Sequence, residues 1–243
     1  MAIGRNRDVI VRRDVFFVAI ASTMLLFVLA GFAKTFFARA YFGTLDFVLG
    51  TPELPIHLRV HGVILVAWFG LFVAQTFLVA TGRTRLHRQL GVAGAVLASL
   101  VVGSGLITVV KAVSRSAGLP VEALRALVFA NSAALAAFSI CLLRGLALRS
   151  DPSIHKRMMV IASSNICVQA GARVGELFGL SKAAFSLPTL LIFLLAMVVY
   201  DLATERRVHT ATVWGGCVSI ACPVLFVIIG NSSIGDAVVE LLR

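Results

Sequence analysis

Long apolar blocks separated by short polar segments make up most of the chain. A helix needs about 20 apolar residues to cross a bilayer, and lipid-exposed strands would leave their backbone groups unpaired. The blocks therefore predict an all-α fold, a polytopic transmembrane bundle. Seven segments reach or approach the required length: Val15–Phe37, Pro55–Ala80, His87–Val113, Pro120–Leu146, Pro152–Phe178, Leu187–Leu202 and Ala211–Ile229.

Capping residues and prolines support several of these boundaries. Asp151 followed by Pro152 is typical of a helix N-terminus, where a side chain caps and proline fills the first turn. Pro55 and Pro120 open the second and fourth segments in the same way. The sixth segment is the shortest, and its start is predicted near Pro188.

The segments divide the chain into a basic N-terminus (1–14), a seven-helix transmembrane domain (15–230) and a short C-terminal tail (231–243). The first segment has a basic start and a small-x-small sequence at Ala38–Ala40, as a cleaved signal peptide would. Its apolar core is longer than the roughly 7–15 residues of signal peptides. We therefore expect it to be retained as a span.

The distribution of Lys and Arg predicts the orientation. With the N-terminus inside, 13 of the 22 basic residues lie in inner segments: Arg5, Arg7, Arg12, Arg13, Arg83, Arg85, Arg88, Arg144, Arg149, Lys156, Arg157, Arg206 and Arg207. Cytoplasmic loops carry an excess of such residues. A cytoplasmic N-terminus and, with seven spans, an external C-terminus are expected.

Composition agrees with a membrane environment. Of the 243 residues, 59% are hydrophobic and 14% charged, and the mean hydropathy is +0.98. Soluble domains have about 45–50% apolar and about 25% charged residues. The net charge of +11 falls in short clusters between apolar blocks, which indicates anionic headgroups at the inner face of the bilayer as the partner, not nucleic acid.

Polar side chains form one narrow stripe on the second predicted helix: His57, His61, Trp68 and Gln75, with Phe72 between them. Such groups are expensive at membrane depth and need a partner or a function. Two interpretations remain open. The stripe is either a bundle-facing surface hydrogen-bonded to neighbouring helices, or one wall of a ligand or cofactor site.

The fifth predicted helix combines two patterns. Polar residues recur at three- or four-residue intervals, at Asn165, Gln169, Arg173 and Glu176. Glycines recur every four residues on roughly the opposite face, at Gly171, Gly175 and Gly179. Small residues at this spacing let another helix approach closely, within one chain or in an oligomer or larger membrane complex.

A polar pocket that binds a small molecule or a lipid is one hypothesis. At a rise of about 1.5 Å per residue, Asn131 lies near the depth of Asn165, and His61 near that of Gln169. If the helices are neighbours, His61, Asn131, Gln169, Arg173 and Glu176 line an outward-opening pocket. A simple ion pair between Arg173 and Glu176 is the alternative for the last two.

Three histidines open the helices that run from inside to outside: His87, His155 and His209, with Asp151 and Asp201 nearby. Histidines with carboxylates can hold a divalent metal. His87 and His155 are also placed to ligate one haem b. Binding of lipid phosphate and a role as interfacial anchors are the other interpretations.

Recognised catalytic motifs are missing from the sequence. It contains no G-x-S-x-G, Walker A, H-E-x-x-H or G-x-G-x-x-G pattern. The first hypothesis is therefore a non-enzymatic binding, accessory or transport component. The alternative is a membrane redox protein that uses the inner histidines.

Several of these residues recur in motifs of a known family. His61-Gly62, Trp68, Gln75 and the run from His87 to Gly91 resemble a bacterial "predicted membrane protein" family of unknown function. The same holds for His155–Met159 and for the stretch from Tyr200 to Gly215. The resemblance covers most of the chain from the second helix onward. It implies a multi-pass protein of the bacterial inner membrane, without an assigned substrate or cofactor.

Overall fold

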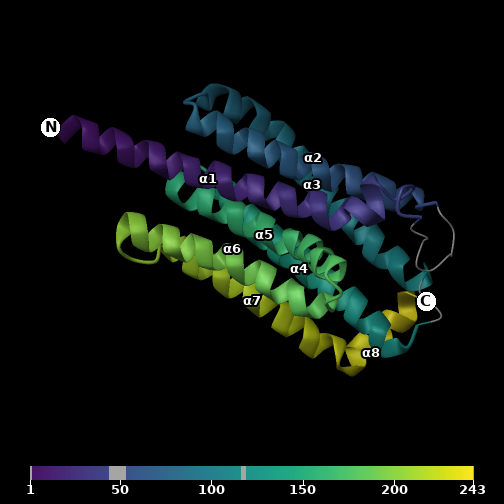
Figure 1. Ribbon diagram of the computed structural model, residues 1–243. Coiled ribbons are helices and arrows are strands. Elements are labelled where there is room, and N and C mark those ends of the chain that lie inside the picture. The colour runs from purple at the N-terminus through teal and green to yellow at the C-terminus, as the bar shows by residue number, and fades with distance from the viewer. Residues whose placement is uncertain (1, 44–52, 116–118, 243) are drawn as a thin grey trace.

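The computed structural model describes residues 2–43, 53–115 and 119–242 (Figure 1). Within these residues the chain is all helical and has no strand, as predicted. The elements are α1 (Ala2–Phe32), η1 (Ala33–Phe37), α2 (Ile56–Ala80), α3 (Thr84–Arg115), α4 (Val121–Ala147), α5 (Pro152–Leu177), α6 (Lys182–Glu205), α7 (Thr210–Gly230) and α8 (Ser233–Leu242).

Six of the helices are long and apolar enough to cross a membrane. Their apolar spans are Val15–Phe37, Ile56–Ala80, Thr84–Ser114, Val121–Ala147, Ala184–Glu205 and Thr210–Gly230. Many large apolar side chains on them point outward, among them Val92, Ile192 and Leu195. Lipid is the solvent that such surfaces require, as expected for a multi-pass membrane protein.

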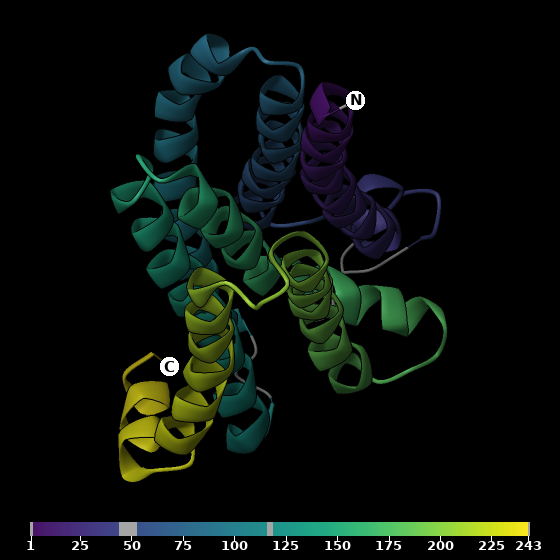
Figure 2. The same cartoon turned by 90° about the vertical axis from the view of Figure 1, so that its left-hand side faces the viewer.

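The remaining long helix, α5, lies at the centre of the bundle (Figures 1 and 2). It forms where the fifth segment was predicted, but it is not among the six apolar spans. α1, α4, α6 and α7 pack around it. Because other helices cover α5, it can carry buried polar residues such as Arg157, Ser163 and Asn165 that a lipid-facing helix would exclude.

Glycines set how closely α5 approaches its neighbours. A Cβ atom on Gly171 would overlap the side chain of Thr189, and one on Gly175 would lie 2.7 Å from the Cβ of Phe185. The predicted small-residue face therefore packs against α6. Gly179 has a different role, because its φ of +74° places it in the left-handed turn that follows α5.

Most predicted helix boundaries are confirmed, and one is wrong. Asp151 caps α5 by accepting hydrogen bonds from Ser153 N (2.8 Å) and Ile154 N (3.2 Å). α6, however, begins at Lys182, with Ser181 as its N-cap, and Pro188 lies inside the helix. As the seventh residue of α6, Pro188 lies beyond the four N-terminal amides that lack an intrahelical partner, so it removes one hydrogen bond from the interior of the helix. Membrane helices tolerate such prolines where neighbouring groups satisfy the freed carbonyl.

The two ends of the chain are more helical than the sequence predicts. α1 begins at Ala2, so residues 2–14 belong to the first helix; the basic side chains of this segment lie outside the described residues. The C-terminal tail forms α8. Gly235 packs against the backbone of Gly230, and Asp236 pairs with Arg125 of α4 at 3.2 Å. α8 thereby closes one end of the bundle.

Candidate functional site

Polar groups gather at one end of the bundle, where the α2–α3, α4–α5 and α6–α7 turns meet. We call it the His155 end. It is at the left of Figure 1 and faces the viewer in Figure 2. α3, α5 and α7 begin at this end, while α2, α4 and α6 finish there. Segments far apart in the sequence thus share one region.

Arg157 of α5 is a completely buried charge at this end. Its guanidinium is fully enclosed and pairs with two carboxylates of α6. Nε donates to Asp201 Oδ1 at 2.8 Å, and Nη2 donates to Glu205 Oε1 at 2.6 Å. Nη1 donates to Ser153, to its backbone oxygen at 2.9 Å and to its hydroxyl at 2.6 Å. The sequence placed Arg157 among the inner cations and did not predict this pairing.

Asp201 extends the network to α7. Its second oxygen, Oδ2, accepts from the His209 backbone N–H at 3.0 Å and from the Thr212 hydroxyl at 2.6 Å. The His209 ring caps α7, since Nδ1 accepts from Ala211 N at 3.0 Å. A neutral ring that accepts at Nδ1 carries its proton on Nε2, which therefore donates to the Ser153 hydroxyl at 3.2 Å. The network joins α5, α6 and α7.

His87 and His155 form a separate pair at the same end. Their ring centroids, on α3 and α5, are 6.3 Å apart and the rings are nearly perpendicular, at 77°. His155 Nδ1 lies 2.8 Å from the Gly145 carbonyl oxygen of α4. The side-chain amide of Gln75, on α2, matches its neighbours when its nitrogen faces His87 and its oxygen faces Gly91. In this orientation it donates to His87 Nδ1 at 2.6 Å and accepts from Gly91 N at 3.0 Å. Four helices thus hold two half-buried imidazoles.

The predicted three-histidine metal site is not assembled. His209 is bonded to Ser153 and Ala211, and Asp151 caps α5. In the described part of the chain, no three His, Cys, Asp or Glu side chains are grouped to hold a metal ion. Of the residues in that hypothesis, the structure brings together His87 with His155, and separately Asp201 with the backbone N–H of His209.

The polar stripe of α2 is divided among different neighbours. His61 Nδ1 lies 2.9 Å from the Ser104 hydroxyl of α3, and His57 is half-buried one turn earlier. Trp68 Nε1 donates to Ser163 of α5 at 3.3 Å. Gln75 belongs to the His87 pair. The stripe therefore joins α2 to two helices, in agreement with the bundle-facing interpretation.

The other residues of the predicted outer pocket also make separate contacts. Asn165 Nδ2 donates to Ser219 of α7, and Asn131 Nδ2 donates to a carbonyl of its own helix. The Arg173 guanidinium lies 4.7 Å from the centre of the Phe32 ring of α1. Gln169 is half-buried on α5, and Glu176 is exposed near its end.

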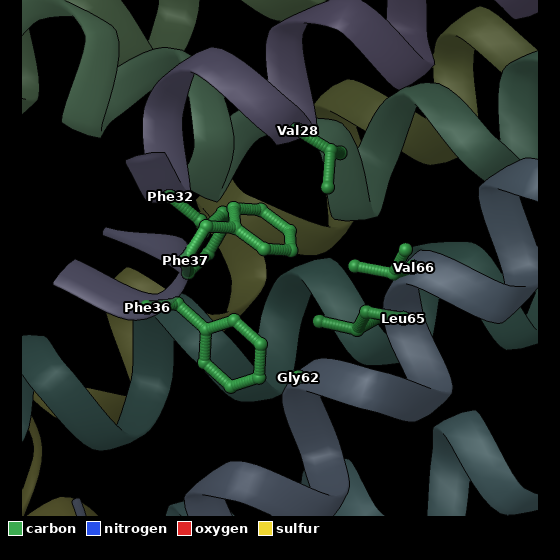
Figure 3. A pocket seen from close by; sticks show the side chains of 7 residues that line it. All are labelled: Val28, Phe32, Phe36, Phe37, Gly62, Leu65 and Val66. Atoms are coloured by element: carbon green, nitrogen blue, oxygen red, sulfur yellow. The ribbon is translucent and has the colours of Figure 1, made fainter. Parts of the chain in front are cut away.

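A small cavity near Arg173 is apolar. It lies between α1, η1 and α2, as Figure 3 shows, and its lining residues are Val28, Phe32, Phe36, Phe37, Gly62, Leu65 and Val66. Its volume is about 10 Å³. Sites for small molecules occupy about 300–1,000 Å³. Binding of a small molecule by the outer polar residues therefore stays a prediction.

Comparisons with known proteins give no further guide to the function. No family model, no curated protein and no solved structure matches this chain. The resemblance to a bacterial membrane family stays a prediction, although its motif residues His87, His155, Asp201 and His209 all lie at the His155 end.

Proposed function

We propose that this protein binds a transition-metal ion through His87 and His155, at the end of the membrane bundle where these histidines meet. The observation that carries the proposal is the 6.3 Å separation of the two ring centroids. Two imidazoles that bind one ion from opposite sides have centroids about 6–6.5 Å apart, because each metal–nitrogen bond is about 2.0–2.1 Å. The separation of the two rings matches this geometry, which also requires their Nε2 atoms to face each other.

The partner of His155 favours the same function, whereas the partner of His87 allows it after a rearrangement. A histidine ligand usually donates its second N–H to a carbonyl or carboxylate, which fixes the ring orientation. The Gly145 carbonyl can accept this proton from His155 Nδ1 without any rearrangement. Gln75 can accept it from His87 through Oε1 after a half-turn of its amide, at the loss of its bonds to Gly91 N and to the His87 backbone oxygen. Nε2 of each ring is then the metal ligand.

Ligand chemistry narrows the choice of metal. Neutral imidazoles suit copper, iron, nickel and zinc, whereas magnesium and calcium prefer oxygen ligands. Two protein ligands leave further coordination positions for water or for a macrocycle, so haem iron is one form the metal can take. A metal-handling or electron-transfer role in the membrane follows from such a site.

Metal loading of the purified protein tests this proposal. The detergent-solubilised chain, incubated with Cu²⁺ or Zn²⁺ and then desalted, is expected to retain one equivalent by elemental analysis. His87→Ala and His155→Ala should each abolish retention, and Gln75→Leu should weaken binding about 10–100-fold. His209→Ala is the matched control, since that ring is bonded to other partners.

Equal retention by the wild type and by both histidine variants would refute the metal site. An absorption spectrum after incubation with haemin distinguishes haem iron from a free metal ion as the bound form. A Soret band that is lost in His87→Ala would identify haem iron as the bound form, and the free ion would be favoured by metal retention without that band.

We further propose that α5 is a seventh span, with the N-terminus of the chain in the cytoplasm of a bacterial cell. α5 has 26 residues and runs alongside the six apolar helices, which supports a full crossing (Figure 1). Several of the polar groups that make it less apolar, among them Arg157, Ser163 and Asn165, are buried against its neighbours. The basic residues of the three turns at the His155 end favour the cytoplasmic side for that end.

A further inference from the structure

Arg144 and Trp214 form an unusual contact at the His155 end. Arg144 lies in the last turn of α4 and Trp214 near the start of α7. The guanidinium carbon is 4.3 Å from the centre of the indole ring. A cation held over a Trp face within about 6 Å is attracted by the ring electrons. The contact fixes a long, flexible side chain against a rigid one.

The charge of Arg144 has no acidic counterpart among the described residues. Its Nε atom is buried and donates to no acceptor among the described residues. The other arginine of α4, Arg125, also has a buried Nε but pairs with Glu122 and Asp236. Arg157 is neutralised by two carboxylates. Arg144 therefore differs from both, because the tryptophan ring holds it but does not neutralise it.

The position of the pair indicates contact with lipid. Leu143, next to Arg144, is 65% exposed, and Val213, next to Trp214, is 52% exposed. Both residues of the pair lie about one turn from the ends of their helices, which is about 5 Å. In a bilayer this depth is the interfacial region, where Trp is enriched.

We propose that Arg144 and Trp214 bind the phosphate of an anionic phospholipid. Arginine offers a planar fork of N–H donors that matches phosphate oxygens, and the ring holds that fork in place. A lipid phosphate supplies both the acceptors and the negative charge that the described residues do not. The acyl chains then lie along the exposed apolar sides of α4 and α7, beside Leu143 and Val213.

Thermal unfolding in a neutral detergent, with added lipid, tests this site. Phosphatidylglycerol should raise the unfolding temperature of the wild type more than phosphatidylcholine does. Inorganic phosphate at the same concentration should raise it little, because it lacks acyl chains. Arg144→Ala should weaken the phosphatidylglycerol response about fivefold in apparent affinity. Native mass spectrometry, which counts bound phospholipids, gives a second measurement on the wild type alone.

Arg149→Ala is the matched control. Arg149 lies just beyond the end of α4, in the α4–α5 turn, where it donates a hydrogen bond to the Leu146 carbonyl at 3.2 Å. An equal loss in Arg149→Ala would mean a diffuse electrostatic effect and would overturn the site. So would an unchanged response in Arg144→Ala, or an equal response to inorganic phosphate. If Arg144→Ala does not fold, Trp214→Leu tests the same pair. Neither variant touches His87 or His155, so failure here is distinct from failure of the metal site.

Discussion

Arg157 and Asp201 are the residues on which the His155 end depends most. Both side chains are completely buried, and each makes hydrogen bonds to more than one element. Removal of one partner from a buried ion pair leaves the other charge in a medium of low polarity. This loss typically costs about 3–5 kcal/mol.

Asp201→Asn is therefore expected to lower the free energy of unfolding by about 3–5 kcal/mol. The neutral amide cannot balance Arg157, and it accepts weakly from Thr212 and from the His209 backbone. Thermal unfolding in detergent measures the change. Glu205→Gln is the comparison, because Glu205 is 28% exposed and water can replace part of its contact. A larger loss in Glu205→Gln than in Asp201→Asn would contradict this account.

At the scale of the element, α5 organises the bundle because its faces have different chemistry. Gly171 and Gly175 admit α6, and on another side Gly31 of α1 packs against the backbone of Ala170. The polar residues Ser163 and Asn165 reach α2 and α7 by hydrogen bonds. Small residues and hydrogen bonds are the usual means of helix association in lipid, where apolar helices have no hydrophobic reason to associate.

Gly171→Ala should destabilise the bundle. The added methyl group would overlap Thr189, so α6 must move away from α5. Gly70→Ala is the matched control, because a Cβ atom there meets nothing within 4 Å. It should be neutral, or stabilising by at most about 1 kcal/mol from the higher helix propensity of alanine. Equal thermal midpoints for the two variants in detergent would show that α5 and α6 are less tightly packed than described.

At the scale of the whole molecule, the two chain ends lie at opposite ends of the bundle (Figure 1). The first helix starts at the His155 end, and α8 folds back against α4 and α7 at the other. The proposed crossing of the membrane by α5 makes the number of spans odd, in agreement with this arrangement. It also puts the proposed metal and lipid sites on one side of the membrane, the side where the basic turns lie.

A topology reporter fused after Arg243 should therefore read as external. An alkaline phosphatase fusion is expected to be active and a green fluorescent protein fusion dark in a bacterial host. A fusion in the α4–α5 turn, after Arg149, should give the reverse result and serves as the control. A cytoplasmic signal from both the C-terminal fusion and the α4–α5 fusion would mean that α5 does not cross the membrane.

The sequence by itself determined that the chain is a set of membrane helices and where most of them begin. Apolar length and local capping are properties of one segment, so Asp151 and the helix starts after Pro55 and Pro120 could be read without a structure. Pro188 misled the prediction of α6 because it was interpreted as a helix start, whereas membrane helices also tolerate proline in their interior.

Only the tertiary structure decided which polar groups meet. Arg157 and Asp201 are distant in sequence, and nothing in either segment specifies the other as its partner. The same is true of His87 with His155 and of Arg144 with Trp214. Periodicity gives the face and depth of a side chain on its own helix, whereas the neighbour of that face follows from close packing at glycines such as Gly171 and Gly31.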